Sequence, residues 1–390
     1  MRLTIAIAAC YLGMPLAIAE DLFIDPANDA DHFGDPEEAL FWTSEQKVAG
    51  FRNSDQIFWT RVVEAGDAPL ALPDATRNLG DVVLRVNDDS MTVDEYFSKK
   101  KVAGLLVIKD GEIIYERYGL GNTEDSRWVS FSVTKSVVSM LVGAAIRDGY
   151  IDGVDEMVSR YVPRMQGSSY DRSSIRDILQ MSSGVAWNED YSDPESDIST
   201  VEWSTLPLLD TLGEKPRVAE PGEVFNYNTA ETNLAGVVLR SAIGNNLSTY
   251  LSEKIWKPFG MESDAVWNLT EEGGGEFGGC CISATLRDYG RLGLFAMANG
   301  QLPDGTEVLP EGWMAESTQP STGNKGYGYY WWLQPNGSYS ASGIFGQSIR
   351  VDNKNNIVIA VQSARDEAST NEDWAWHNAL NNALTEAVSE

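Results

Sequence analysis

The clearest chemical signal in the sequence is a serine and a lysine three positions apart, Ser132 and Lys135. Lys135 is the only charged residue in the apolar stretch 128–146, which is typical of a buried helix. Positions i and i+3 share one helix face, so the amine is expected beside the hydroxyl. Burial disfavours the charged ammonium and lowers its pKa, which would let the amine act as a base near neutral pH. The pair therefore predicts an activated serine nucleophile.

The helix that carries this pair is predicted from about Ser132 to Asp148, ending at Gly149. At its start, free backbone N–H groups and the helix dipole would favour negative charge on the serine oxygen. A second pair with the same spacing, Ser98 and Lys101, lies in the lysine cluster FSKKK, which we interpret as solvated surface. Such spacing also arises by chance or for structural reasons, so spacing alone does not establish a nucleophile.

The elements around the helix predict an α/β (α+β) fold. Residues 103–108 and 112–117 form a predicted hairpin across Asp110-Gly111. Helix-like segments occupy about 150–270, β-rich segments return from Tyr327 onward, and a last helix is predicted over 372–388. This order predicts one antiparallel sheet built from both termini and flanked by helices, with an inserted, mainly helical domain.

We divide the chain into residues 1–19, a loop-rich acidic lead-in over 20–95, and a domain over 96–390. The first part has a short positive start, an apolar core and Ala17-Ile18-Ala19, which predicts a signal peptide cleaved after Ala19. The mature protein would then be periplasmic or secreted. An N-terminal membrane anchor and a lipoprotein attached at Cys10 remain open alternatives.

The composition excludes several kinds of site. The formal charge of −29 disfavours binding to nucleic acid or anionic lipid. Only two histidines, His32 and His377, are present, so a three-histidine zinc site is impossible and a Ser-His-Asp triad is disfavoured. We expect no metal or cofactor. Cys280 and Cys281 are adjacent, and adjacent cysteines rarely meet disulfide geometry, so a fold without disulfides is expected.

The segment RWVSFSVTKSVVSMLVGAAIRDGYIDGVDEMVSRYVP resembles the nucleophile helix of the β-lactamase-like serine hydrolases. This superfamily includes class C β-lactamases, DD-peptidases, family VIII carboxylesterases and 6-aminohexanoate-dimer hydrolases. Further similar stretches follow in order at 175–191, 221–239, 255–261, 278–293 and 339–352. The stretches MSSGVAWNEDY and GIFGQ look closest to the aminohexanoate branch. The resemblance implies a β-lactamase/transpeptidase-like fold.

This resemblance implies that Tyr227 moves protons together with Lys135, and a charged amine beside it would lower the pKa of the phenol. The asparagine of the family's Tyr-x-Asn motif is replaced by Thr229. The Lys/His-x-Gly motif falls on Ala341-Ser342-Gly343, without the charge that would hold a β-lactam carboxylate. Both departures argue against a dedicated β-lactamase.

The resemblance also places the backbone N–H groups of Ser132 and Ile344 as an oxyanion hole. Thr229, Ser342 and Gly343 would lie along the substrate. Tyr191 resembles a lid tyrosine that holds an amide, and Trp187 would line an apolar cleft. The aromatic run 329–332 would either line this cleft or pack in the core.

Together these observations predict a serine hydrolase that cleaves a linear amide or ester through an acyl-enzyme on Ser132. Its partner would be a small-molecule substrate, without nucleic acid and without stable membrane insertion. A β-lactamase or DD-peptidase is the alternative enzyme. A non-catalytic binding protein that kept the fold is the alternative of another class.

Overall fold

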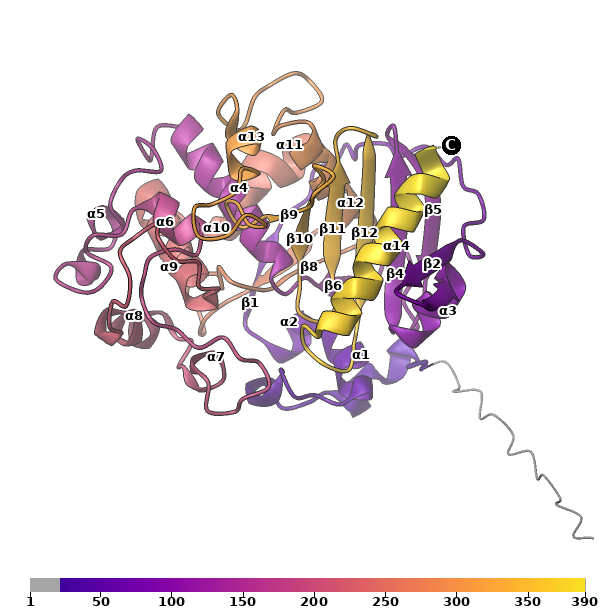
Figure 1. Ribbon diagram of the computed structural model, residues 1–390, viewed down its shortest axis with the longest axis horizontal. Helices are drawn as coiled ribbons and strands as arrows, with labels where there is room; N and C mark the ends of the chain where they lie inside the picture. The colour runs from indigo at the N-terminus through magenta and orange to yellow at the C-terminus, as the bar shows by residue number, and fades with distance from the viewer. Residues whose placement is uncertain (1–21, 390) are drawn as a thin grey trace, which may run out of the picture.

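The structure, a computed structural model, describes residues 22–389. Its main layer is a six-stranded antiparallel sheet in the order β5-β4-β12-β11-β10-β9 (Figure 1). The strands are β4 (Val102–Lys109), β5 (Glu112–Tyr118), β9 (Trp332–Leu333), β10 (Tyr339–Ser342), β11 (Ser348–Asp352) and β12 (Ile357–Ser363). Strand β12 pairs with β4, with Ile357 opposite Lys109. The predicted sheet built from both ends of the chain, including its hairpin, is therefore confirmed.

Helices bury both faces of this sheet. Leu106 and Ile108 belong to the core shared with α12 (Leu286–Met297), whereas Leu105 and Val107 pack in the core that contains α14 (Asn371–Ser389). This alternation follows from the two-residue period of a strand, and burial on both faces explains why β4 is apolar throughout.

The mainly helical part surrounds α4 (Val133–Arg147), which packs against α9 (Thr229–Ile243). In Figure 1 most of this part lies to the left of the main sheet, and α4 contacts β10. The remaining elements here are α5 (Val158–Tyr161), η3 (Pro163–Met165), α6 (Ile175–Leu179), α7 (Asp197–Thr200), α8 (Thr205–Glu214), α10 (Leu247–Leu251), η4 (Ser252–Trp256) and α11 (Lys257–Phe259). Every residue of α4 from Val133 to Ala145 is buried, which agrees with its apolar sequence.

The lead-in is less loop-rich than its composition predicts. It contains η1 (Pro26–His32), η2 (Pro36–Glu38), α1 (Ser44–Arg52), α2 (Ser54–Ile57), β1 (Thr60–Val63), the hairpin β2 (Val83–Val86) and β3 (Asp89–Thr92), and the start of α3 (Val93–Lys99). Strand β1 joins a second antiparallel sheet, β1-β7-β8-β6, formed with β6 (Trp128–Val129), β7 (Ala265–Asn268) and β8 (Ile282–Ala284). These strands are short and distant in sequence, so local patterns did not reveal the second sheet.

The predicted aromatic strand near residue 330 is mostly not a strand. Only β9 is extended there, because Tyr330 has a left-handed backbone with φ of 61°. Tyr329, Tyr330 and Trp331 are buried in the core next to α13 (Trp313–Ser317), as the packing alternative predicted.

Within residues 22–389, no helix has both the length and the apolar character needed to cross a membrane. The predicted signal peptide and Cys10 lie outside the described residues.

Candidate active site

Ser132 lies at the N-terminal end of α4, directly after a left-handed residue, Phe131, with φ of 46°. Its hydroxyl points toward Lys135 instead of capping the first helical turn. The side chain is only 8% exposed but borders a large cleft. The helix start thus presents a serine oxygen to the cleft with the helix dipole behind it.

Three oxygen atoms surround the amine of Lys135. Its Nζ lies 2.9 Å from Ser132 Oγ, 3.0 Å from Thr229 Oγ1 and 2.8 Å from the carbonyl oxygen of Gly279. The residue is 1% exposed, and burial lowers the pKa of its amine to about 7, although the charge of Glu189 raises it. The predicted base is therefore beside the predicted nucleophile and is substantially neutral at neutral pH.

Glu189 is a member of the site that the sequence interpretation missed. Its carboxylate accepts hydrogen bonds from the hydroxyl of Thr229 and from the Thr229 backbone N–H at 3.0 Å. It also accepts hydrogen bonds from the phenol of Tyr191 at 2.7 Å and from the indole of Trp187. A signal was available: this carboxylate stands two positions from each of the two selected aromatic residues.

Thr229 connects Glu189 to Lys135. Asn228 caps α9 by accepting a hydrogen bond from the N–H of Glu231 at 3.1 Å, which places Thr229 in the first turn. From there the hydroxyl of Thr229 donates to Glu189 and accepts from Lys135. The threonine that replaces the family's asparagine is thus part of the chain of hydrogen bonds to the base.

Tyr227 lies beside the same amine, with its ring centre 5.2 Å from Lys135 Nζ. Its ring stacks on Trp332, with the ring centres 5.8 Å apart. Burial raises the pKa of the phenol; a hydrogen bond with Ser132 acts in the opposite direction, and the charge of Glu189 adds to the rise. The prediction that the pKa of Tyr227 is lowered is therefore wrong. Burial disfavours the tyrosinate, and it also disfavours the charged form of Lys135 that would have stabilised the tyrosinate. Tyr227 is a protonated phenol.

The two backbone N–H groups of the predicted oxyanion hole make no hydrogen bond within the described part of the protein. Among residues 22–389, no protein group accepts a hydrogen bond from the backbone N–H of Ser132 or of Ile344. At Gly343 a side chain would not fit, because a Cβ atom would lie 2.6 Å from the carbonyl oxygen of Ser130. This close approach brings the segment after β10 against the turn that carries Ser132 and leaves both donors available to a ligand.

The cleft has a volume of about 820 Å³, and its lining includes Ser132, Thr229, Tyr191 and Ile344. Five other predicted site residues lie outside this lining: Lys135, Trp187, Tyr227, Ser342 and Gly343. Trp187 is buried and supports Glu189, so its predicted contact with substrate is corrected to a supporting role. Tyr227 reaches the site through its neighbours Ser132 and Lys135.

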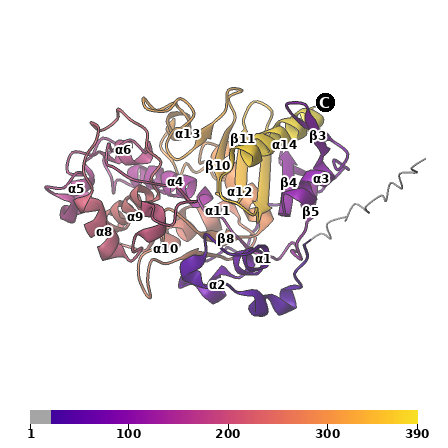
Figure 2. The same cartoon turned by 60° about the horizontal axis from the view of Figure 1, so that its bottom comes forward.

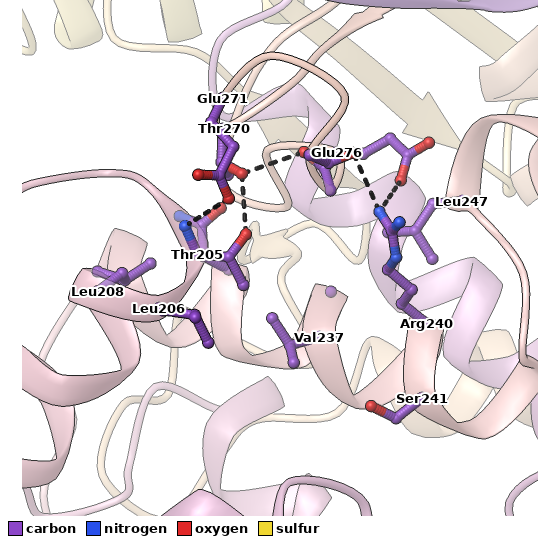
Figure 3. A pocket seen from close by; sticks show the side chains of 14 residues that line it. Thr205, Leu206, Leu208, Val237, Arg240, Ser241, Leu247, Thr270, Glu271 and Glu276 are labelled. Atoms are coloured by element: carbon purple, nitrogen blue, oxygen red, sulfur yellow. Dashed lines mark hydrogen bonds and ion pairs between the residues drawn. The ribbon is translucent and has the colours of Figure 1, made fainter.

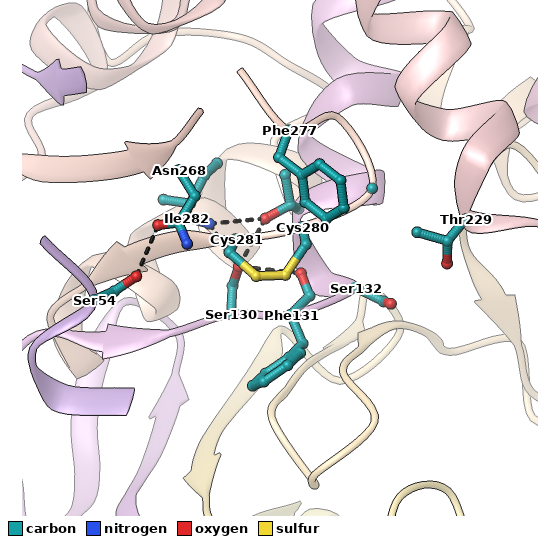
Figure 4. The surroundings of a disulfide bond; sticks show 12 residues. Ser54, Ser130, Phe131, Ser132, Thr229, Asn268, Phe277, Cys280, Cys281 and Ile282 are labelled. Carbon is teal, nitrogen blue, oxygen red and sulfur yellow. Dashed lines mark hydrogen bonds between the residues drawn. A yellow bond between two sulfur atoms is a disulfide. The ribbon is translucent and has the colours of Figure 1, made fainter. Parts of the chain in front are cut away.

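Cys280 and Cys281 form a disulfide on the wall of the cleft (Figure 4). The expectation of a fold without disulfides is therefore wrong. The two cysteines are adjacent in the sequence, and the peptide bond between them is cis. The preceding residue is Gly279, whose carbonyl accepts a hydrogen bond from Lys135.

His377 is a packed residue. Its Nδ1 lies 3.2 Å from the phenol oxygen of Tyr96 and 3.0 Å from a guanidinium nitrogen of Arg365. Burial and the charges of Arg365 and Arg350 hold its pKa well below the usual value.

Comparison with known proteins decides the family. The model of the family described as "Beta-lactamase" matches residues 92–382. The chain belongs to the Beta-lactamase family.

Individual members of this family narrow the relationship. The chain is 29% identical over 307 residues to a 6-aminohexanoate-dimer hydrolase of Paenarthrobacter ureafaciens, covering 72% of this chain and 76% of that protein. A solved structure of a Bacillus anthracis protein proposed to be a 6-aminohexanoate-dimer hydrolase has a TM-score of 0.79 and 21% identity, covering 88% of this chain and 94% of the other. A family VIII carboxylesterase structure has a TM-score of 0.59 and 18% identity, covering 75% of this chain and 95% of the other.

These similarities confirm the predicted β-lactamase/transpeptidase-like fold. The protein is a hydrolase of this fold related to the 6-aminohexanoate-dimer hydrolases.

Proposed function

We propose that this protein hydrolyses a linear amide or ester through an acyl-enzyme on Ser132. The observation that carries this proposal is the arrangement of three oxygen atoms around the buried amine of Lys135. A serine beside a base of matched pKa is the arrangement that nucleophilic catalysis requires.

The hydrogen bonds around Lys135 indicate where its lone pair points. The carbonyl of Gly279 can only accept, and the hydroxyl of Thr229 gives its proton to Glu189. Both oxygen atoms therefore accept a hydrogen bond from Lys135 Nζ. A neutral amine has only two N–H bonds, so these two hydrogen bonds use both of them. The lone pair is left for the third neighbour, the hydroxyl of Ser132.

The reaction then follows from these positions. Ser132 Oγ attacks the carbonyl carbon while its proton passes to Lys135 Nζ. The N–H groups of Ser132 and Ile344 stabilise the oxyanion. The phenol of Tyr227 gives a proton to the leaving nitrogen or oxygen and is reprotonated by Lys135. Water attacks the acyl-enzyme, and the same groups return Ser132 to its starting state.

Two observations favour a linear amide or ester over a β-lactam. Position 341 holds Ala341 in place of a cation, and the described lining of the cleft contains no lysine or arginine to hold a carboxylate. One relative is named as a hydrolase of 6-aminohexanoate dimer and one structural neighbour as a carboxylesterase, which supports the amide and ester classes.

The test combines labelling with turnover. A fluorophosphonate probe is expected to modify Ser132, and Ser132→Ala is expected to abolish both the adduct and the hydrolysis of p-nitrophenyl esters. A panel of esters, linear amides and β-lactams then assigns the class, with nitrocefin expected to be the poorest substrate. An unlabelled wild-type protein would favour the non-catalytic binding protein, and activity retained by Ser132→Ala would show that another residue is the nucleophile.

A further inference from the structure

One wall of the cleft comes from the N-terminal segment, outside residues 92–382 that the family model matches. We call the six largest apolar side chains that this segment gives to the lining, apart from Ile57, the N-terminal wall: Leu40, Phe41, Trp42, Phe51, Phe58 and Trp59. Figure 2, in which the bottom of Figure 1 comes forward, shows α1 and α2 near the second sheet, and contacts join α1 to β6 and α2 to β7. The family's catalytic groups therefore face an apolar surface that a separate segment supplies.

Two rings of the N-terminal wall are exposed, Phe41 at 55% and Trp59 at 58%. The buried ring of Trp42 packs against two other rings of the same wall, with its centre 6.2 Å from that of Phe51 and 6.1 Å from that of Phe58. Exposed aromatic rings on a supported concave surface are the usual lining of a site for an apolar ligand.

The N-terminal wall is continuous with the oxyanion side of the site. The ring centre of Phe51 lies 4.9 Å from that of Phe131 and 5.5 Å from that of Phe345, the neighbours of Ser132 and Ile344. Tyr227, which protonates the leaving group in the proposed reaction, packs on a different set of rings, including Trp332. The acyl part of a substrate is thus the part that extends along the N-terminal wall.

The charges of the cleft select against anions. Its charged lining residues are Glu37, Glu271 and Glu272, all exposed, and no basic residue occurs in the described lining. Glu271 also borders a second cavity of about 490 Å³ on the far side of the loop, where Arg240 pairs with Glu276 at 3.8 Å (Figure 3). Arg240 therefore lies in the neighbouring cavity and does not neutralise the cleft. The edge of the cleft that contains Ser132 carries negative charge from its three glutamates.

We infer that the cleft binds substrates whose bulky apolar acyl group, a long alkyl chain or an aromatic ring without negative charge, is laid against the N-terminal wall. This inference rests on the proposed function. It adds a substrate class that the catalytic groups alone do not specify.

The test is kcat/KM for p-nitrophenyl esters from acetate to decanoate, which vary only the acyl chain. A pocket that buries each methylene gains several-fold per carbon, so octanoate is expected to exceed acetate by at least about 10-fold. The double variant Phe41→Ala/Trp59→Ala is expected to lose about 10-fold on octanoate and less than about two-fold on acetate. Phe23→Ala is the matched control, because Phe23 is 66% exposed in the same segment but outside the lining.

Two further substrate series complete the design. The mono-p-nitrophenyl ester of octanedioic acid, which adds a terminal carboxylate, is expected to react at least about 10-fold more slowly than octanoate. Acetate esters of alcohols of increasing length are expected to show a flat profile.

A flat acyl-chain profile with Ser132-dependent turnover of the acetate ester would overturn the inference and leave the proposed function intact. A length dependence confined to the alcohol would overturn the placement of the acyl chain. Absence of both turnover and fluorophosphonate labelling would remove the proposed function, and the inference with it.

Discussion

Two serine–lysine pairs with the same spacing occur in this chain, and their surroundings are opposite. Lys135 is buried among neutral oxygens, with Ser132 Oγ 2.9 Å from its amine. Lys101 lies beyond the end of α3, which stops at Lys99, and has a left-handed backbone with φ of 50°. Its amine pairs with Asp366 and lies 2.6 Å from Ser44 Oγ.

The difference teaches that spacing selects candidates and that the environment assigns the chemistry. A continuous helix keeps Ser132 and Lys135 on one face, whereas Ser98 and Lys101 are separated by a helix end. Burial among neutral oxygens favours the neutral amine that a base requires, and a carboxylate partner favours the ammonium.

The largest expected effect separates the two lysines directly. Lys135→Met removes the base, so we expect kcat/KM for p-nitrophenyl esters to fall by about 10²–10⁴-fold. Lys101→Met removes a surface ion pair and is expected to change kcat/KM by less than about two-fold. Thermal unfolding is the control: Lys135→Met should stay folded, because a methionine avoids the cost of burying an amine. Equal losses in both variants would contradict the comparison.

A smaller effect is expected from the hydroxyl that joins Glu189 to Lys135. Thr229→Val keeps the side-chain shape but removes the group that accepts from Lys135 and donates to Glu189. The amine loses part of its orientation, so kcat/KM should fall by about 10-fold. Thr229→Ser retains the hydroxyl and is expected to stay within about three-fold of the wild type. An equal loss in the two variants would assign the role to the methyl group and its packing.

The smallest expected effect is a shift in pH dependence. Burial lowers the pKa of Lys135 to about 7, so the amine is protonated below this pH and neutral above it. Activity should therefore rise with pH through a midpoint near 7. The carboxylate of Glu189 raises this pKa, so Glu189→Gln should move the midpoint downward. A midpoint that stays in place or moves upward would show that Glu189 does not act on the base.

Much of the architecture followed from local patterns. The hairpin β4–β5, the helix α4 and the C-terminal helix α14 were predictable, because turn chemistry and apolar periodicity are properties of neighbouring residues. The second sheet was not predictable, since β1 and β7 are four-residue strands from opposite parts of the chain.

For the candidate site, too, some contacts follow from local sequence and others only from the tertiary structure. The sequence by itself placed Ser132 beside Lys135, because helical geometry joins positions three apart. Only the tertiary structure brought Thr229, Glu189 and Gly279 to that amine, paired Cys280 with Cys281, and set the N-terminal wall against the cleft. The protonation of Tyr227 was also decided there. The protonation of a side chain depends on its burial, and burial depends on which distant segments pack over it. The neighbouring residues in the sequence do not determine that packing.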